Sequence, residues 1–164
     1  MNPNPIQLRQ ANETEALVLL EIMHAAFEEY RGWLDPPSGV HVETVESVLA
    51  KLKTATAVIA FVGTEAAGCV FYEPKDNHLY LGRLSVLPQF RKLGVGRALI
   101  DYVEAQAANL KVPRVQLGVR IALPRLKAYY EQLGYRIISY ETHPGYAQPT
   151  YVMMEKDVKT GSAE

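Results

Sequence analysis

Two glycines and three cationic residues stand together between Arg91 and Arg97, in the string RKLGVGR, directly before a helical pattern. Backbone N–H groups in the first turn of a helix have no partner within that helix, and the aligned peptide dipoles add partial positive charge there. Gly94 and Gly96 carry no Cβ, so a bulky anion can approach the main chain closely. Lys92 and the two arginines add full charges nearby. The segment therefore predicts a seat for a phosphate group.

Two familiar kinds of nucleotide loop do not fit this segment. A Walker A loop needs the string G-x-x-x-x-G-K-[ST], which occurs nowhere in the chain. A dinucleotide fingerprint needs a third glycine, where this chain has Leu99. That fingerprint also needs an acidic residue after the next strand, where Val119 is followed by Arg120. The pattern therefore excludes a nucleotide triphosphatase and argues against a dinucleotide enzyme.

The periodicity around the glycine segment alternates between strands and helices. It predicts helices that begin near residues 12, 43, 95 and 124, and strands over 6–10, 57–62, 67–72, 79–86, 115–119, 135–140 and 151–154. Strand 79–86, the following helix and strand 115–119 form one βαβ unit, so these two strands are expected to be parallel. The order β-α-α-β-β-β-α-β-α-β-β predicts an α/β protein with a mixed sheet flanked by helices.

Length and composition limit the classes of protein that fit. With 164 residues, 48% apolar and 21% charged, the chain is expected to form one globular domain over 5–157, with flexible termini at 1–4 and 158–164. A net charge of −1 argues against a nucleic-acid or membrane surface as partner. The single cysteine, Cys69, allows no internal disulfide, and no signal peptide or apolar span is evident. We therefore expect a cytoplasmic protein.

Two motifs together point to a family. Residues 91–96 match R-x-x-G-x-G and follow the string VLPQF at 86–90, while YYEQLGY at 129–135 matches Y-x-x-x-G-[FY] at the expected distance. This combination, with the order of elements, resembles the GNAT superfamily of acyl-CoA-dependent N-acetyltransferases over about residues 5–157. The resemblance implies a single-domain fold with a mostly antiparallel sheet of about seven strands and four helices.

The resemblance also implies a coenzyme site, with acetyl-CoA as the cosubstrate. The pyrophosphate would lie on the glycine segment, and the pantetheine arm would run beside the end of strand 79–86. There a backbone N–H of Leu84 or Ser85 would polarise the thioester carbonyl. The implied coenzyme-binding residues are Leu84, Ser85, Val86, Arg91, Lys92, Leu93, Gly94, Val95, Gly96 and Arg97.

Tyr130 aligns with the tyrosine that protonates the departing thiolate in many members of the family. A phenol is neutral at pH 7 and is a competent proton donor. The alternative is that Tyr130 only packs, since it shares an apolar stripe with Leu126 and Leu133. One position departs from the family pattern: where an asparagine often bonds the pantetheine, this chain has Leu123.

The general base and the acceptor are less determined by the sequence. The base candidates are Glu28, Glu29, Glu43, Glu73, His78, His143 or a water relay. Phe27, Tyr30 and Trp33 lie at the end of the first helix and in the loop after it, a region that forms part of the acceptor wall in relatives, and Tyr80 on strand 79–86 is a fourth candidate for acceptor binding. The first two also continue the apolar face of their helix, which favours a core role. Such a wall with scattered carboxylates would suit a small cationic or aromatic amine.

These observations predict an N-acetyltransferase that moves an acetyl group from acetyl-CoA to a primary amine, small molecule rather than protein, by direct attack. Two alternatives stay open: a non-catalytic acyl-CoA-binding module, and an acetyltransferase acting on protein amines. No metal site is expected. Members of the family are often dimers, but no feature of this sequence decides the oligomeric state. Cys69 is expected to be a packed residue rather than a nucleophile, because no histidine partner is evident.

Overall fold

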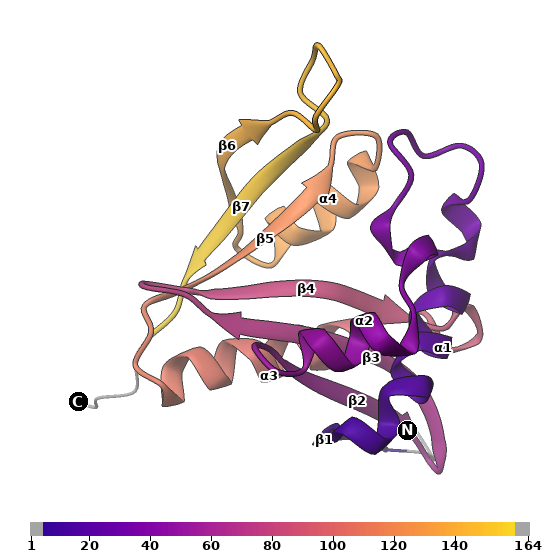
Figure 1. The fold of residues 1–164 in the computed structure, drawn as a ribbon. Coiled ribbons are helices and arrows are strands. Elements are labelled where there is room, and N and C mark those ends of the chain that lie inside the picture. The colour runs from indigo at the N-terminus through magenta and orange to yellow at the C-terminus, as the bar shows by residue number, and fades with distance from the viewer. Residues whose placement is uncertain (1–4, 160–164) are drawn as a thin grey trace. The chain divides into compact units, whose positions relative to one another are not determined.

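The computed structural model describes residues 5–159, which divide into two compact units (Figure 1). The first unit comprises the residues up to Glu73 together with Leu81–Val103, and the second comprises Pro74–Tyr80 and the residues from Glu104 onward. The expected flexible segments, 1–4 and 158–164, lie outside the described residues except for Val158 and Lys159. The Val158 N–H donates to the Pro113 carbonyl over 2.8 Å.

The elements appear in the predicted order. The strands are β1 (Ile6–Gln10), β2 (Thr56–Val62), β3 (Glu65–Pro74), β4 (Leu79–Val86), β5 (Arg114–Arg120), β6 (Arg136–Glu141) and β7 (Tyr151–Asp157). The helices are α1 (Ala16–Phe27), α2 (Val45–Lys51), α3 (Val95–Asn109) and α4 (Pro124–Gln132). Short 3-10 turns lie before and after α1, before α2 and after β4.

The seven strands have the order β1-β2-β3-β4-β5-β7-β6. The β4–β5 pair is parallel, with Leu79 opposite Val115 and Tyr80 opposite Gln116, whereas β1–β2, β2–β3, β5–β7 and β6–β7 are antiparallel. The predicted fold class, a mostly antiparallel mixed sheet with four helices, is therefore confirmed, as is the parallel βαβ unit.

In the first unit, strands β2 and β3 are buried on both faces. One face packs against α1 and α2 in a core that includes Leu19, Met23, Val48 and Ile59. The start of α3 lies over the other face, where Val95 and Leu99 approach the strand backbone at Gly68 in β3. Helices therefore cover the centre of this sheet from both sides.

The second unit has one buried strand face and one more open face. Along β5 the burial alternates: Val115, Leu117 and Val119 are buried, while Gln116 is half-buried and Gly118 is exposed. This period of two is that of a strand with one face in the core. The more open face of β5 therefore offers side chains and backbone to other molecules.

Local sequence signals set several helix boundaries. The Asn12 side chain accepts from the Thr14 N–H, and Glu15 bonds back to the Asn12 N–H, which completes the predicted capping box ahead of α1. Thr44 and Ser47 form a second capping box at α2. Pro124 occupies the first turn of α4.

Gly68 is required by close packing between neighbouring strands. A Cβ built on Gly68 would lie 2.6 Å from the Ser85 carbonyl oxygen, a backbone atom that cannot turn aside. The same Cβ would lie 3.1 Å from Cγ1 of Val95. A side chain at this position would therefore push β4 or α3 away from β3.

Gly68→Ala is expected to destabilise the protein by ~1–3 kcal/mol, the range typical of overpacking a close-packed interior. Gly118→Ala is the matched control, because its Cβ would meet its neighbours at 3.5 Å or more, an ordinary contact distance. Chemical denaturation of both variants measures the difference. Equal stability of the two variants would contradict the packing argument.

Candidate functional site

The glycine segment has an unusual backbone. Lys92 has a φ of +65° and Gly94 a φ of +88°, with Leu93 between them outside the positive region. Such alternation turns successive N–H groups toward a common side and forms concave anion sites. The first α-helical bond of α3 runs from the Ala98 N–H to the Gly94 carbonyl over 3.0 Å. The N–H groups ahead of this bond have no acceptor within the helix itself, which is the arrangement that binds anions at helix N-termini.

The three cations of this segment have different surroundings. The Arg91 guanidinium donates to the Ala26 carbonyl over 3.1 Å and to the Val86 carbonyl over 3.3 Å, and it pairs with Glu29 at 2.7 Å. Arg97 pairs with Asp101 one turn along α3, at 3.1 Å. The Lys92 side chain is exposed. Arg91 thus links the segment to the ends of α1 and β4 in addition to adding charge.

The segment has room for a pyrophosphate. The nearest atom to a Cβ built on Gly94 is Cδ1 of Ile6 at 3.9 Å. Arg91 through Gly94 are all exposed, and Gly96 is half-buried. Open N–H groups, the helix dipole and neighbouring cations are together what a diphosphate needs. The residues present therefore fit the coenzyme that the family resemblance implies.

The end of β4, where the pantetheine arm is expected, is kinked. Arg83 has a φ of +55°, in the left-handed region that a non-glycine residue enters only with some strain. The Ser85 hydroxyl donates to the Arg83 carbonyl over 3.0 Å, and the Ser85 side chain is buried. Such irregularities re-aim backbone groups and cluster at functional sites. The kink precedes Leu84 and Ser85, whose N–H groups are the predicted thioester contacts.

The kink is held by contacts that no sequence pattern indicates. Arg83 pairs at 3.0 Å with Glu43, whose side chain is only 8% exposed. Its guanidinium also lies against Gly39, where a Cβ would be 3.1 Å from Nη2 of Arg83. Glu43 also accepts a hydrogen bond from the Ser47 hydroxyl. A partly buried ion pair between the segment just before α2 and β4 therefore supports the strained residue.

Cys69 lies in the core of the first unit, fully buried. Burial raises the pKa of its thiol to about 12, and a hydrogen bond with the Ser85 side chain acts in the opposite direction. The thiolate is the reactive form of cysteine, so this side chain is inert at neutral pH. The expectation of a packed cysteine is confirmed.

The aromatic residues after α1 form a row. Phe27 and Tyr30 meet edge to face at 5.6 Å between ring centroids, and Tyr30 and Trp33 do so at 5.9 Å. The Trp33 indole N–H donates to the Glu29 carbonyl over 2.7 Å, which fixes the ring while 55% of the residue stays exposed. Three of the four predicted acceptor residues therefore lie together in the first unit.

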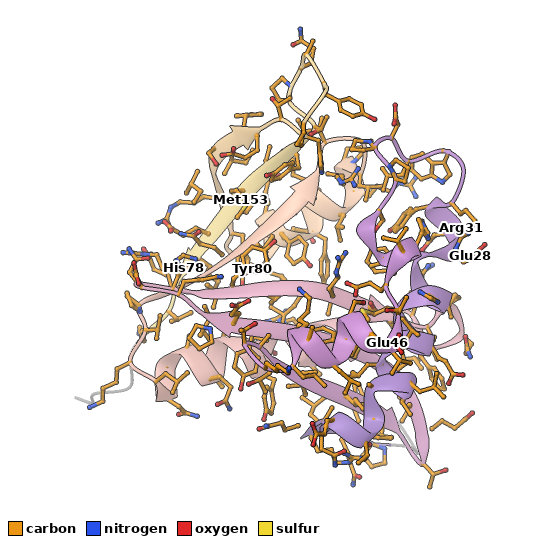
Figure 2. All side chains as sticks on the ribbon, in the orientation of Figure 1. Glu28, Arg31, Glu46, His78, Tyr80 and Met153 are labelled. Carbon is orange, nitrogen blue, oxygen red and sulfur yellow. The ribbon has the colours of Figure 1, made fainter. Side chains whose placement is uncertain are left out.

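The second unit holds Tyr130 and Tyr80. Tyr130 is 4% exposed and packs edge to face against Tyr129 and Tyr135, at 5.6 and 5.7 Å. Its backbone carbonyl accepts from the Tyr135 N–H. Tyr80 is half-buried at the start of β4, where Figure 2 labels it close to His78. The packing of Tyr130 leaves both of its predicted roles open.

The carboxylate candidates for a general base are mostly engaged. Glu28 pairs with Arg31 at 3.0 Å, and both are labelled in Figure 2. Glu29 pairs with Arg91, and Glu43 pairs with Arg83. Each of these three carboxylates therefore already has a cationic partner.

The two histidine candidates, His78 and His143, both have lowered pKa values. Burial lowers the pKa of His143, and the charge of Arg120 lowers it further. Burial likewise lowers the pKa of His78. Nδ1 of His143 lies 2.5 Å from the Thr150 hydroxyl, and the His143 backbone N–H donates to the same oxygen. Both rings are therefore neutral near pH 7, and that of His143 is held in place.

Comparison with known proteins decides the family. The sequence model of the acetyltransferase (GNAT) family matches residues 19–135. The chain belongs to the GNAT acetyltransferase family. It is 30% identical over 94 residues to an N-acetyltransferase of Halalkalibacterium halodurans that is itself called uncharacterized, an alignment that covers 57% of this chain. The chain spans about half the length of that relative, 51%.

Solved GNAT structures share the fold over nearly the whole chain. The PaiA N-acetyltransferase of Thermoplasma acidophilum, solved in complex with coenzyme A, has a TM-score of 0.76 at 18% identity and covers 93% of this chain and 99% of its own. The ribosomal-protein-S18-alanine N-acetyltransferase of Escherichia coli has a TM-score of 0.75 at 16% identity and covers 98% of both chains. Family membership supports the predicted class of enzyme, an acyltransferase that uses acetyl-CoA.

Gly96→Glu is expected to weaken coenzyme A binding at least ~100-fold, because it places bulk and negative charge where the helix dipole favours an anion. Ala105→Glu is the matched control, since it adds the same carboxylate at an exposed position of the same helix. Isothermal titration with coenzyme A measures both affinities. Retained affinity in the Gly96 variant, with the fold intact by circular dichroism, would refute the assignment of this seat.

Proposed function

We propose that this GNAT protein is an N-acetyltransferase that moves an acetyl group from acetyl-CoA to the primary amine of a small molecule by direct attack. The observation that carries the proposal is the segment Arg91–Arg97, which is exposed over Arg91–Gly94 and has positive φ at Lys92 and Gly94 ahead of α3. Residues 5–157 would form the N-acetyltransferase domain, which contains the whole stretch matched by the family model.

Each part of the chain has a proposed task. Bound acetyl-CoA supplies an acetyl thioester. The first-turn N–H groups of α3 hold the diphosphate, and the backbone at Leu84 or Ser85 polarises the thioester carbonyl, which stabilises developing negative charge on oxygen. A C–N bond forms as the C–S bond breaks. Tyr130 donates its phenolic proton to the departing sulfur, and the attacking amine gives up its own proton.

The proton from the amine needs an acceptor, and the surroundings favour a neutral histidine or a water relay over a paired carboxylate. His143 is a candidate because its lowered pKa keeps the ring neutral, and Thr150 holds it in place. Glu28, Glu29 and Glu43 are each in an ion pair. An imidazole close to neutral pH is an effective base for this step.

The acceptor is proposed to be a small molecule because of the aromatic row Phe27–Tyr30–Trp33. Two rings packed edge to face and a fixed, half-exposed indole offer flat apolar surface with carboxylates close by. The fold alone does not choose the acceptor, since one structural relative is by its name an alanine N-acetyltransferase for a ribosomal protein.

No described helix is long and apolar enough to cross a membrane. We propose the cytoplasm as the compartment, since the lone Cys69 is a buried free thiol. The proposed partners are acetyl-CoA and the amine.

Release of free thiol from acetyl-CoA, measured against a panel of small amines and of peptides with free N-termini, tests the function. Amine-dependent release with small amines is the expected result. Release with peptides alone would replace the small molecule by a protein acceptor. Tight coenzyme binding without release for any amine would instead indicate an acyl-CoA-binding module.

Tyr130→Phe is expected to lower turnover ~100-fold or more, the lower end of what a positioned general acid contributes. Coenzyme affinity should change little, because the ring and its contacts with Tyr129 and Tyr135 remain. Tyr129→Phe is the matched control, as it removes a hydroxyl from the neighbouring ring of the same stack. Steady-state kinetics compare the two; equal turnover in both would remove Tyr130 from the mechanism.

A further inference from the structure

Gly118, in the middle of β5, is a glycine that the backbone does not require. Glycines at Gly94 and Gly134 have positive φ, and Gly68 is needed because a Cβ would strike a backbone oxygen. Gly118 has no positive φ, and a Cβ there would meet its neighbours at 3.5 Å or more. A glycine in a strand interior weakens the strand unless something has to come close to its backbone.

Three side chains, two tyrosines and one methionine, surround Gly118. A Cβ on Gly118 would lie 3.5 Å from the Met153 sulfur, 3.6 Å from the Tyr151 ring and 3.7 Å from the Tyr80 hydroxyl oxygen. Met153 and Tyr151 come from β7 and Tyr80 from β4, the two strands that flank β5. Figure 2 labels Met153 and Tyr80. Gly118 nevertheless stays exposed, so these three side chains surround the glycine without covering it.

The ring of Tyr151 packs in turn against His143. The His143 ring lies 4.9 Å from the Tyr151 ring, and Nδ1 of His143 contacts the Thr150 hydroxyl. Tyr151 lies opposite Arg120 in the β5–β7 register, and Met153 lies opposite Gly118. Residues opposite each other in an antiparallel pair share a face of the sheet, so Tyr151 and Met153 lie on the same face as Gly118.

We propose that Gly118 is a specificity-determining residue, and that a flat aromatic group of the acceptor amine packs on its backbone between Tyr80, Tyr151 and Met153. This inference rests on the proposed function and adds the class of acceptor, a primary amine that carries an aryl group. Aromatic rings pair favourably edge to face or offset, and a thioether sulfur contacts ring edges well. A side chain larger than methyl at position 118 occupies the space that the aryl group needs.

The test compares wild type, Gly118→Ala and Gly118→Val with 2-phenylethylamine and butylamine as acceptors. Wild type should favour the aryl amine, and valine at position 118 should lower the aryl-to-alkyl ratio of kcat/KM at least ~10-fold, as a few methylenes in a specificity pocket do. Alanine should have a smaller effect. Ala128→Val, at an exposed position of α4, is the matched control for added bulk and should keep the wild-type ratio.

A binding measurement separates this inference from the proposed function. Saturation-transfer NMR with 2-phenylethylamine in the absence of acetyl-CoA should show contacts to the ring protons in wild type and their loss in the valine variant. If no amine supports thiol release, the proposed function fails, and the NMR result alone then tests whether an aryl amine binds at Gly118. An unchanged ratio together with unchanged ring contacts overturns the inference, as does absence of ring contacts in wild type.

Acyl donors of different length test whether Gly118 faces the acyl group or the acceptor amine. If Gly118→Val changes the preference among acetyl-, propionyl- and butyryl-CoA while the amine ratio stays constant, the glycine faces the acyl group and the acceptor assignment is wrong. A changed amine ratio with a constant acyl preference supports it. Thermal unfolding of the valine variant should match or exceed wild type, because valine suits a strand better than glycine.

Discussion

A backbone that keeps its N–H groups open for an anion cannot use them to hold itself in place. The segment Arg91–Arg97 meets this constraint with a side chain: Arg91 bonds the Ala26 and Val86 carbonyls and pairs with Glu29. These contacts tie the segment to the C-terminal ends of α1 and β4. Arginine suits this task because its planar fork of donors can serve several acceptors at once.

The same first unit carries a second supported distortion, in β4. Arg83 adopts a left-handed conformation that Glu43 and Gly39 hold from outside the strand. Close packing of Gly68 on the Ser85 backbone then fixes the strand after the kink. In both places a conformation unfavourable by itself is stabilised by neighbours distant in the sequence, as is common where a protein prepares a binding surface.

Local signals in the sequence predicted most of the fold. Strand Leu79–Val86 appears with the predicted bounds, the capping box at Asn12 precedes α1, and Gly134 has the positive φ expected just past α4. Each of these depends on residues within a few positions of one another. The glycine and tyrosine motifs predicted the family for the same reason, because short strings carry them.

The features that sequence did not predict depend on contacts between distant residues. No residue close to Arg83 in the sequence predicts its positive φ, which is supported by the ion pair with Glu43. The neighbours of Gly118 likewise come from strands that are distant in the sequence. Arg91 was expected as a phosphate-binding charge; its contacts with Ala26 and Glu29 require the three-dimensional arrangement. The general base could not be chosen from sequence for the same reason, because the ion pairs of Glu28, Glu29 and Glu43 are known only from the structure.

Neither compact unit is a continuous piece of chain, and this affects the order in which the protein can fold during synthesis. Pro74–Tyr80 belongs to the second unit but leaves the ribosome well before β5, with which Leu79 and Tyr80 pair. Chains emerge at roughly 5–20 residues per second, so these residues wait for seconds without their partner strand. Leu79, fully buried in the finished protein, lacks its partner strand during that interval. The start of β4 is therefore without its parallel neighbour until β5 has been synthesised.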